Sequence, residues 1–171
     1  EGLSMIGVFA MTAAITPFVG QNLGAGKGER IRETLRFVIK LSLFWGLGAA
    51  LLLAAVADPI ARLFNDDPEV VAQTTLFLRT VPISYAAFGV ALLVASVFNA
   101  LDQPLKATVL AAIRLVLLAI PLAWLGSELY DLTGLFLGIA AANLISGAIA
   151  GLYARREVRE VAAELSPAPA R

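Results

Sequence analysis

The sequence predicts an all-α fold, a polytopic helical membrane protein with five transmembrane helices, on the strength of three observations. Apolar residues make up 59% of the chain, charged residues 15%, and mean hydropathy is +0.83, values typical of membrane proteins. Five apolar runs each approach the roughly 20 residues that a helix needs to cross a bilayer. The loops between them are alternately rich and poor in Lys and Arg. A soluble domain of this size could not cover five such runs.

The predicted spans are residues 3–19, 37–57, 81–98, 107–125 and 132–154. The first ends in a glycine-spaced segment, residues 20–28, and the second continues an amphipathic segment, residues 29–40, expected to lie on the cytoplasmic surface. Asp67 and Pro68 have the residue types of an N-cap and a first helical position ahead of the third span. Gln103 and Pro104 are expected to begin a helix in the same way ahead of the fourth span. Residues 157–171 are predicted to be a cytoplasmic tail, disordered at its Pro-rich end, residues 166–171.

Basic residues predict how the chain is threaded. The loop after the first span is strongly basic, the third loop holds Lys106, and the segment after the last span is basic again. The second and fourth loops carry mostly acidic residues, including Asp66 and Asp131. Because Lys and Arg favour the cytoplasmic side, loops one and three and the C-terminus are predicted to lie inside. The cytoplasmic basic residues are Lys27, Arg30, Arg32, Arg36, Lys40, Lys106, Arg155, Arg156 and Arg159.

Residue types argue against several function classes. The chain has no Cys and no His, which removes thiolate metal sites, the commonest general base and the commonest metal ligand. The glycine-rich segment is not a phosphate-binding loop, because Gln21 stands where that motif needs Gly and Gly28 where it needs Ser or Thr. No basic face interleaved with aromatic residues indicates nucleic-acid binding. We therefore expect no enzymatic activity, no metal site and no nucleic-acid partner.

Polar residues inside the spans are costly in a bilayer and need an explanation. Arg114 lies roughly 12 Å into the fourth span, at 1.5 Å per residue. It either faces a water-filled cavity or a partner carboxylate, or it extends back to the cytoplasmic head groups. The residues Ser84, Tyr85, Asn143 and Ser146 either line a pathway or form hydrogen bonds between helices, and the second interpretation is favoured.

Two prolines and a stripe of small residues concern helix shape and packing. Pro17 frees the carbonyl of Ala13, which Thr12 or Thr16 could satisfy, and Pro121 frees that of Leu117; both are candidate hinges or kinks. Small residues at a spacing of four let another helix approach closely. This stripe consists of Gly134, Gly138, Ala142, Ser146 and Ala150.

Several stretches, taken in order, resemble the multidrug and toxic compound extrusion (MATE) family of transporters. PFVGQNLGAGK at residues 17–27, followed by Glu29 and Arg30, resembles the end of the family's eighth helix. Together the stretches cover about residues 3–156. The others are LFNDDPEV at 63–70, FNALDQP at 98–104, RL at 114–115, IPLA at 120–123, GLFLG at 134–138 and AN at 142–143.

The resemblance implies twelve helices in two six-helix lobes, of which this chain, over residues 1–156, supplies helices eight to twelve. We therefore expect it to be the C-terminal piece of a longer protein, whose N-terminal lobe is its partner. The implied function is export of organic, often cationic drugs and toxic compounds by antiport with Na⁺ or H⁺, through alternating access between the lobes and without a cofactor. The residues expected to face the cavity are Gln21, Asn22, Tyr85, Asn99, Arg114 and Asn143.

Ion coupling is expected to reside outside this chain, because no Asp or Glu lies in any predicted span. The resemblance also implies a multi-pass location in a bacterial or archaeal plasma membrane. Two alternatives stay open. One is a flippase for lipid-linked oligosaccharides of the same superfamily, against which the single Arg deep in the spans argues. The other is a membrane scaffold that does not transport, which would leave Arg114 unexplained.

Overall fold

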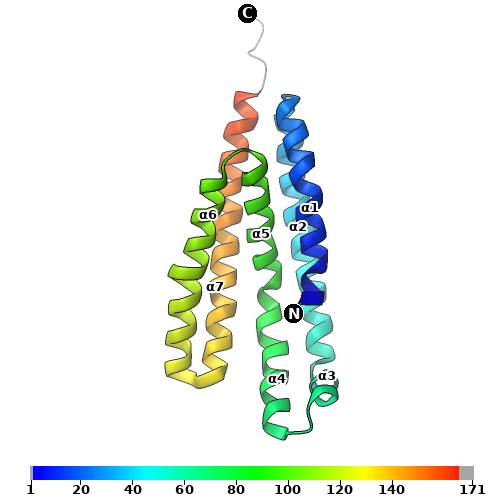
Figure 1. Cartoon of the computed structure of the whole chain (residues 1–171), viewed down its shortest axis with the longest axis vertical. Coiled ribbons are helices and arrows are strands. Elements are labelled where there is room, and N and C mark those ends of the chain that lie inside the picture. The colour runs from blue at the N-terminus through cyan, green and yellow to red at the C-terminus, as the bar shows by residue number, and fades with distance from the viewer. Residues whose placement is uncertain (1, 166–171) are drawn as a thin grey trace, which may run out of the picture.

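The computed structural model describes residues 2–165, and its elements are helical throughout this range, which confirms the all-α prediction (Figure 1). The elements are α1 (Gly2–Gly24), α2 (Gly28–Ala55), α3 (Ala57–Phe64), α4 (Pro68–Thr80), the 3₁₀ turn η1 (Val81–Ser84), α5 (Tyr85–Ala100), α6 (Pro104–Ala112), the π-helical η2 (Ile113–Ala119) and α7 (Ile120–Glu164). The expected disorder of residues 166–171 falls outside the described residues.

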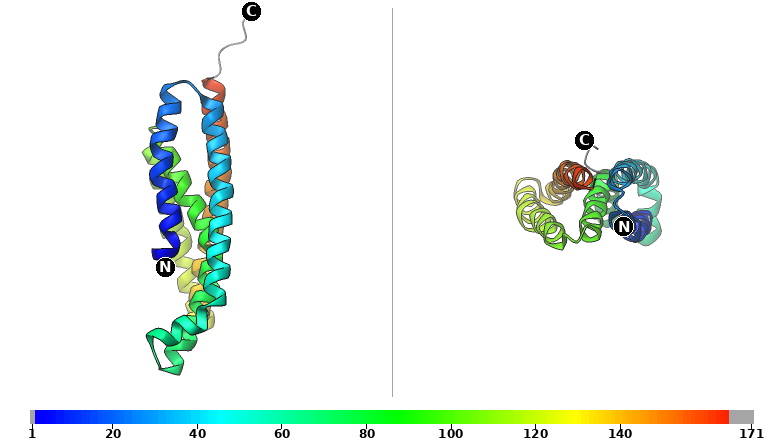
Figure 2. Two further views of the ribbon diagram at one scale, coloured as in Figure 1. Left: turned by 90° about the vertical axis from the view of Figure 1, so that its right-hand side faces the viewer. Right: turned by 90° about the horizontal axis from the view of Figure 1, so that it is seen from above.

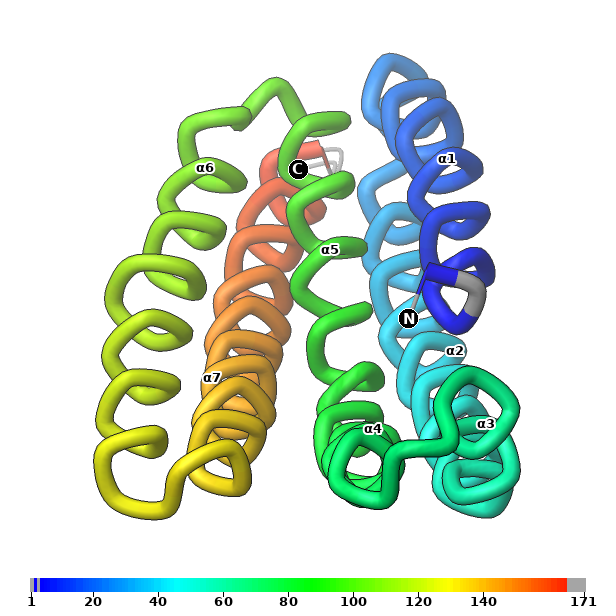
Figure 3. Tube along the Cα trace, turned by 60° about the horizontal axis from the view of Figure 1, so that its bottom comes forward, coloured from blue at the N-terminus to red at the C-terminus, as the bar shows by residue number. Residues whose placement is uncertain are grey.

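Four continuous helical stretches within the described residues are long and apolar enough to cross a membrane: Ser4–Gly24, Gly28–Ala55, Pro68–Ala100 and Pro104–Glu164. The last of these reverses direction at Tyr130 and Asp131, whose backbone is not helical and where Asp131 has φ of 50°. Its two halves lie antiparallel (Figure 3), with Gly126 against the backbone of Gly134. The described residues therefore form five long helices, the number that the sequence predicted.

Helix α5 is the central element of the bundle. It packs against α1, α2, α6 and α7, and the end-on view shows these helices arranged around it (Figure 2). Its residues Leu93, Val94, Val97 and Phe98 have no exposed surface. Helices α1, α2, α6 and α7 therefore hold their positions through contacts with α5.

Glycines bring α2 and α7 close to the first turns of α5. A Cβ atom added at Gly46 of α2 would overlap the backbone of Ala86, and one added at Gly147 of α7 would overlap the backbone carbonyl of Ala87. Ser42 Oγ also donates a hydrogen bond to the carbonyl oxygen of Ala86, 3.2 Å away. Since lipid tails are as apolar as the side chains, association inside a membrane depends on such close van der Waals packing and on hydrogen bonds.

The stripe of small residues in α7 is buried along its whole length, from Gly134 to Ala150. Gly138 lies against the backbone of Leu122, in the first half of the hairpin. The stripe thus faces the first half of the α7 hairpin as well as the core of the bundle.

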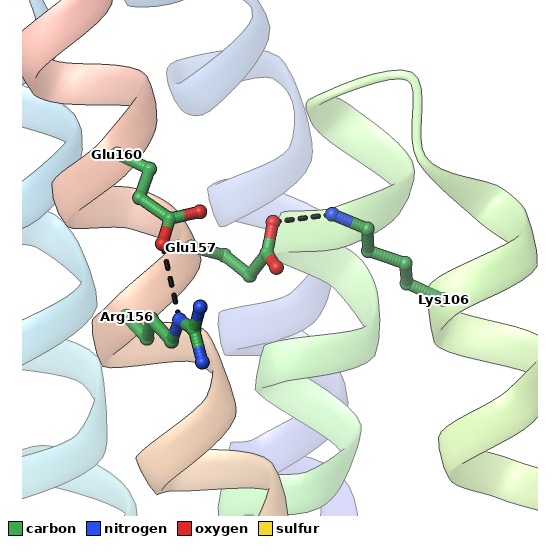
Figure 4. Close-up of polar contacts among 4 residues, drawn as sticks. All are labelled: Lys106, Arg156, Glu157 and Glu160. Carbon is green, nitrogen blue, oxygen red and sulfur yellow. Dashed lines mark hydrogen bonds and ion pairs between the residues drawn. The ribbon is translucent and has the colours of Figure 1, made fainter.

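At the end of the bundle that holds the basic loops, one ion pair ties α6 to α7 and another lies within α7. Lys106 Nζ donates to Glu157, and Arg156 Nε donates to Glu160 at 3.0 Å (Figure 4). The hydrogen bond to Glu157 raises the pKa of Lys106 above its usual value, because it stabilises the charged form. Here α7 continues as a helix to Glu164, so the first part of the predicted tail is helical.

One local expectation from the sequence is wrong, and one short helix was not expected. The amphipathic segment 29–40 does not lie on a surface, because it is the first part of the continuous α2 and buries Ile31 and Leu35 in the bundle. Its apolar side faces other helices and its basic side is exposed. The short helix α3 was also not foreseen, because its eight residues fall between a span and a loop.

The helices accommodate their prolines in different ways. α1 runs as one helix through Pro17. Thr12 Oγ1 donates to the carbonyl of Phe9 and Thr16 Oγ1 to that of Thr12, so neither threonine satisfies the carbonyl of Ala13 as expected. Pro121 lies just after η2, where the backbone adopts π-helical bonding. A proline without an N–H cannot close the preceding turn, and a π segment is one way to pass it.

We predict that Gly46→Ala lowers the midpoint of thermal unfolding of the intact protein in detergent. The added methyl group would press on the backbone of Ala86, and overpacking of this kind costs about 1–3 kcal/mol. Gly48→Ala is the matched control on the same helix, because a Cβ there meets nothing within 4 Å. Equal unfolding midpoints for the two variants would contradict the close α2–α5 contact.

We also predict the sidedness of the bundle. The exposed Ala25 lies at the basic end and the exposed Asp66 at the acidic end. In intact cells, an impermeant maleimide should label Asp66→Cys and should label Ala25→Cys only after permeabilisation. The described residues contain no cysteine that would compete. The reverse labelling pattern would overturn the predicted orientation.

Candidate functional site

A chain of hydrogen-bonded polar side chains connects three helical segments in the interior of the bundle. Arg114 Nη1 donates to Asn143 Oδ1 at 3.3 Å, and Asn143 Nδ2 donates to Ser84 Oγ at 3.0 Å. Ser84 Oγ in turn donates to the carbonyl oxygen of Val81 at 2.7 Å. We call Arg114, Asn143 and Ser84 the polar chain. It joins the π segment η2, the second half of α7 and the junction between η1 and α5.

Local sequence accounts for the positions of the two neutral members. Pro82 lies in η1, a short 3₁₀ turn that separates α4 from α5 and carries Ser84 on its last residue. Asn143 lies on the buried side of α7, and Ser146 Oγ donates to its backbone carbonyl at 3.0 Å. Because the Asn143 amide accepts at one end and donates at the other, its orientation is fixed on both sides. For Ser84 and Asn143 the hydrogen bond runs between helices, as favoured from the sequence, whereas Ser146 bonds within its own helix.

Arg114 is held by two helices and remains partly exposed. Besides its bond to Asn143, its guanidinium lies 4.6 Å from the ring centre of Phe88 in α5, a geometry that attracts a cation to the ring face. Arg114 forms no ion pair with any carboxylate in residues 2–165. The guanidinium therefore lies against α5 and α7 and does not extend to the end of the bundle.

Three of the predicted cavity residues lie together in this region. Arg114 and Asn143 belong to the polar chain, and Tyr85 follows Ser84 directly and is 2% exposed. The structure thus brings together residues that are far apart in the sequence. Phe88 was missed, because an isolated aromatic residue in an apolar span carries no signal of its own.

The other three predicted cavity residues lie near the basic end, apart from the polar chain. Asn22 is buried, and its Nδ2 donates at 2.8 Å to the backbone carbonyl four residues earlier. Gln21 and Asn99 are exposed. The six candidates therefore form two groups and not one cavity within the described residues.

At the acidic end, α3 and α4 enclose a pocket of about 520 Å³ whose charged lining includes Asp58, Arg62 and Arg79. Arg62 Nε donates to Asp58 Oδ2 at 2.8 Å, and this bond holds the pKa of the Asp58 carboxyl below its usual value. This pocket lies outside the apolar part of the bundle. Within residues 2–165 no three His, Cys, Asp or Glu side chains are placed to share a metal ion.

Comparison with known proteins identifies the family. The MatE family model matches residues 1–125. The chain belongs to the MATE family. It is 34% identical over 160 residues to a FAD transporter of Shewanella oneidensis, covering 94% of this chain and 35% of that protein. It is 23% identical over 144 residues to the multidrug export protein MepA of Staphylococcus haemolyticus, covering 84% of this chain and 31% of that one.

Solved structures agree with this assignment. The MATE transporter VcmN of Vibrio cholerae in its bent form superposes with a TM-score of 0.89 at 34% identity, over 93% of this chain and 36% of that one. An inward-facing MATE transporter superposes with a TM-score of 0.86 at 19% identity, which supports the fold alone. The chain thus spans about a third of the length of these relatives and corresponds to about one lobe of a MATE transporter.

We predict that the polar chain stabilises the lobe as a unit. Asn143→Leu should lower the unfolding midpoint, because it leaves a partly buried guanidinium without its acceptor. Adding Arg114→Met to it should recover part of the loss, because removing both partners is less costly than removing one. Asn99→Leu, at an exposed position, is the control and should change little. If the two substitutions lower the midpoint additively, the two side chains do not interact.

Proposed function

We propose that this chain is most of the C-terminal lobe of a MATE exporter that moves small organic compounds across a plasma membrane in exchange for Na⁺ or H⁺. The observation that carries the proposal is the fold: one lobe of the family architecture, with a guanidinium embedded in its membrane-spanning part. Alternating access then follows from the two lobes rocking against each other. The basic end of the bundle, including the C-terminus, lies in the cytoplasm.

The charges within this lobe support the proposal that the coupling ion binds in the other lobe. The predicted spans contain no Asp or Glu, and Arg114 is the only charged residue in them apart from Lys40 near the basic end. A cation site near the bilayer midplane needs ionisable or oxygen-rich groups. We therefore assign the coupling-ion site, and any carboxylate that pairs with a cationic substrate, to the other lobe.

A second substrate class is favoured by one specific observation. Arg114 has no carboxylate partner in residues 2–165 and keeps part of its surface exposed, so it can receive an anionic group. A planar guanidinium binds carboxylates and phosphates bidentately. Since one relative is a FAD transporter, a flavin nucleotide is the second candidate beside organic cations.

Transport by the intact protein in proteoliposomes tests both candidates. We predict that an imposed Na⁺ or pH gradient drives counter-transport of either a fluorescent organic cation or FAD. Failure of both gradients to drive any transport would contradict the exchange mechanism. Transport of FAD but not of the cation would favour the second substrate class.

Arg114 variants then test the role of this lobe. Arg114→Ala should reduce transport about tenfold or more at equal membrane insertion, because hydrogen bonds to a charged group contribute about 1.5–3 kcal/mol. Arg114→Lys should restore only part of it, because an ammonium cannot reproduce the planar fork or the stacking on Phe88. The matched control is Arg156→Ala, an exposed arginine at the basic end. Unchanged transport by Arg114→Ala would leave the residue as a packing group only.

A further inference from the structure

A groove on the membrane-facing part of the bundle lies between α2 and α7, beyond the polar chain. It encloses about 370 Å³ and is lined by apolar and small residues, among them Leu43 of α2, Val90 of α5 and Leu152 of α7. Leu43 and Leu152 are 47% and 67% exposed, so the groove is open to the surroundings of the bundle. In a bilayer those surroundings are lipid chains.

Gly151 keeps the groove open. A Cβ atom there would meet only Val90, at an ordinary distance of 3.6 Å, so the glycine is not required for close helix approach as Gly147 is. A longer side chain at this position would extend into the groove. The space is therefore available to an elongated apolar group.

One charged residue, Arg155, lines the groove, and it lies at the basic end. Gly28 of α2 packs against Ala162 of α7, which sets the register of these antiparallel helices. Arg36 lies about 12 Å beyond Gly28 along α2, and Arg155 about 10 Å back from Ala162 along α7, at 1.5 Å per residue. The two arginines are thus at about the same level along the bundle. Ile39 lines the groove, and Arg36, three residues earlier, lies on the same side of α2.

The charge at this end of the groove is not neutralised by the described part of the chain. Arg36, Arg155 and Arg159 are exposed and form no ion pair within residues 2–165. Arg159 follows Arg155 by four residues and so lies on the same side of α7. Arg156 points to another side, where it pairs with Glu160 (Figure 4).

Two acidic residues of this segment of α7 are engaged elsewhere, and Glu160, which pairs with Arg156, is one of them. Glu157 accepts from Lys106 of α6, on the far side of α7 from the groove. The groove therefore combines an apolar lining with a cluster of guanidinium groups that form no ion pair within residues 2–165. This combination is complementary to an anionic phospholipid and not to a zwitterionic one.

We propose that the groove between α2 and α7 binds an anionic phospholipid, with an acyl chain along Leu43, Gly151 and Leu152 and the phosphate head group at Arg36 and Arg155. Arg159 adds to the positive potential at the head group. Such a lipid would fix the separation of α2 and α7 at the basic end, where these helices contact each other through Gly28.

Native mass spectrometry of the intact, delipidated protein in detergent tests the proposal with phosphatidylglycerol and phosphatidylcholine as probes. Phosphatidylglycerol should bind more tightly. The double variant Arg36→Gln/Arg155→Gln should weaken its binding by about fivefold per arginine and leave phosphatidylcholine binding unchanged. Arg156→Gln is the matched control and should bind phosphatidylglycerol as the wild type does.

Gly151→Leu tests the acyl-chain part separately. It should weaken the binding of both lipids, because the leucine fills the groove, and size-exclusion chromatography checks that the variant is folded. Equal affinity of the wild type for the two lipids would overturn the proposal. So would an undiminished preference for phosphatidylglycerol in the double arginine variant, or no lipid binding at all, as expected if another segment of the protein fills the groove.

Discussion

The close approach of α2 and α7 to the beginning of α5 is the contact on which the rest of the bundle depends. Gly46 and Gly147 leave no room for a side chain against Ala86 and Ala87, so the two outer helices meet α5 at backbone distance. Within a bilayer there is no hydrophobic force to collect helices, and such packing is what holds them together. It also brings α7 near enough for Asn143 to reach Ser84.

The polar chain follows from this packing. Asn143 can accept from Arg114 only because its other end is held by Ser84, and Arg114 can lie over Phe88 only because α5 is the central helix. A guanidinium inside the membrane is thereby fixed without a carboxylate partner in the described part of the chain. In a transporter built from two rocking lobes, such a group can move with its lobe as a rigid part. Under the proposed alternating-access function, its charge would be presented alternately to the two sides of the membrane.

The sequence predicted the five spans, their order and the buried small-residue stripe from Gly134 to Ala150, because length, apolar composition and spacing are local properties. It left the role of Arg114 open between two interpretations, because which helix faces the guanidinium depends on tertiary packing. Gly46 and Gly147 carried no signal, since an isolated glycine in an apolar run looks the same whether or not another helix touches it. The six cavity candidates lie in two separate groups. They were chosen because each is a polar or charged residue in or beside a span, and residue type alone does not tell how far apart such residues lie in the folded chain.

Chemical cross-linking of α5 to α7 in the intact protein tests the central packing most directly. In a cysteine-free background, Ser84→Cys and Asn143→Cys are combined, and a protease site is placed in the loop after Leu101. Mercuric ion, which bridges neighbouring thiols, should keep the two fragments joined after cleavage, whereas cysteines at positions 21 and 143 should not be bridged. Fragments that separate completely in the Ser84/Asn143 pair, with the protein folded and inserted, would contradict the account.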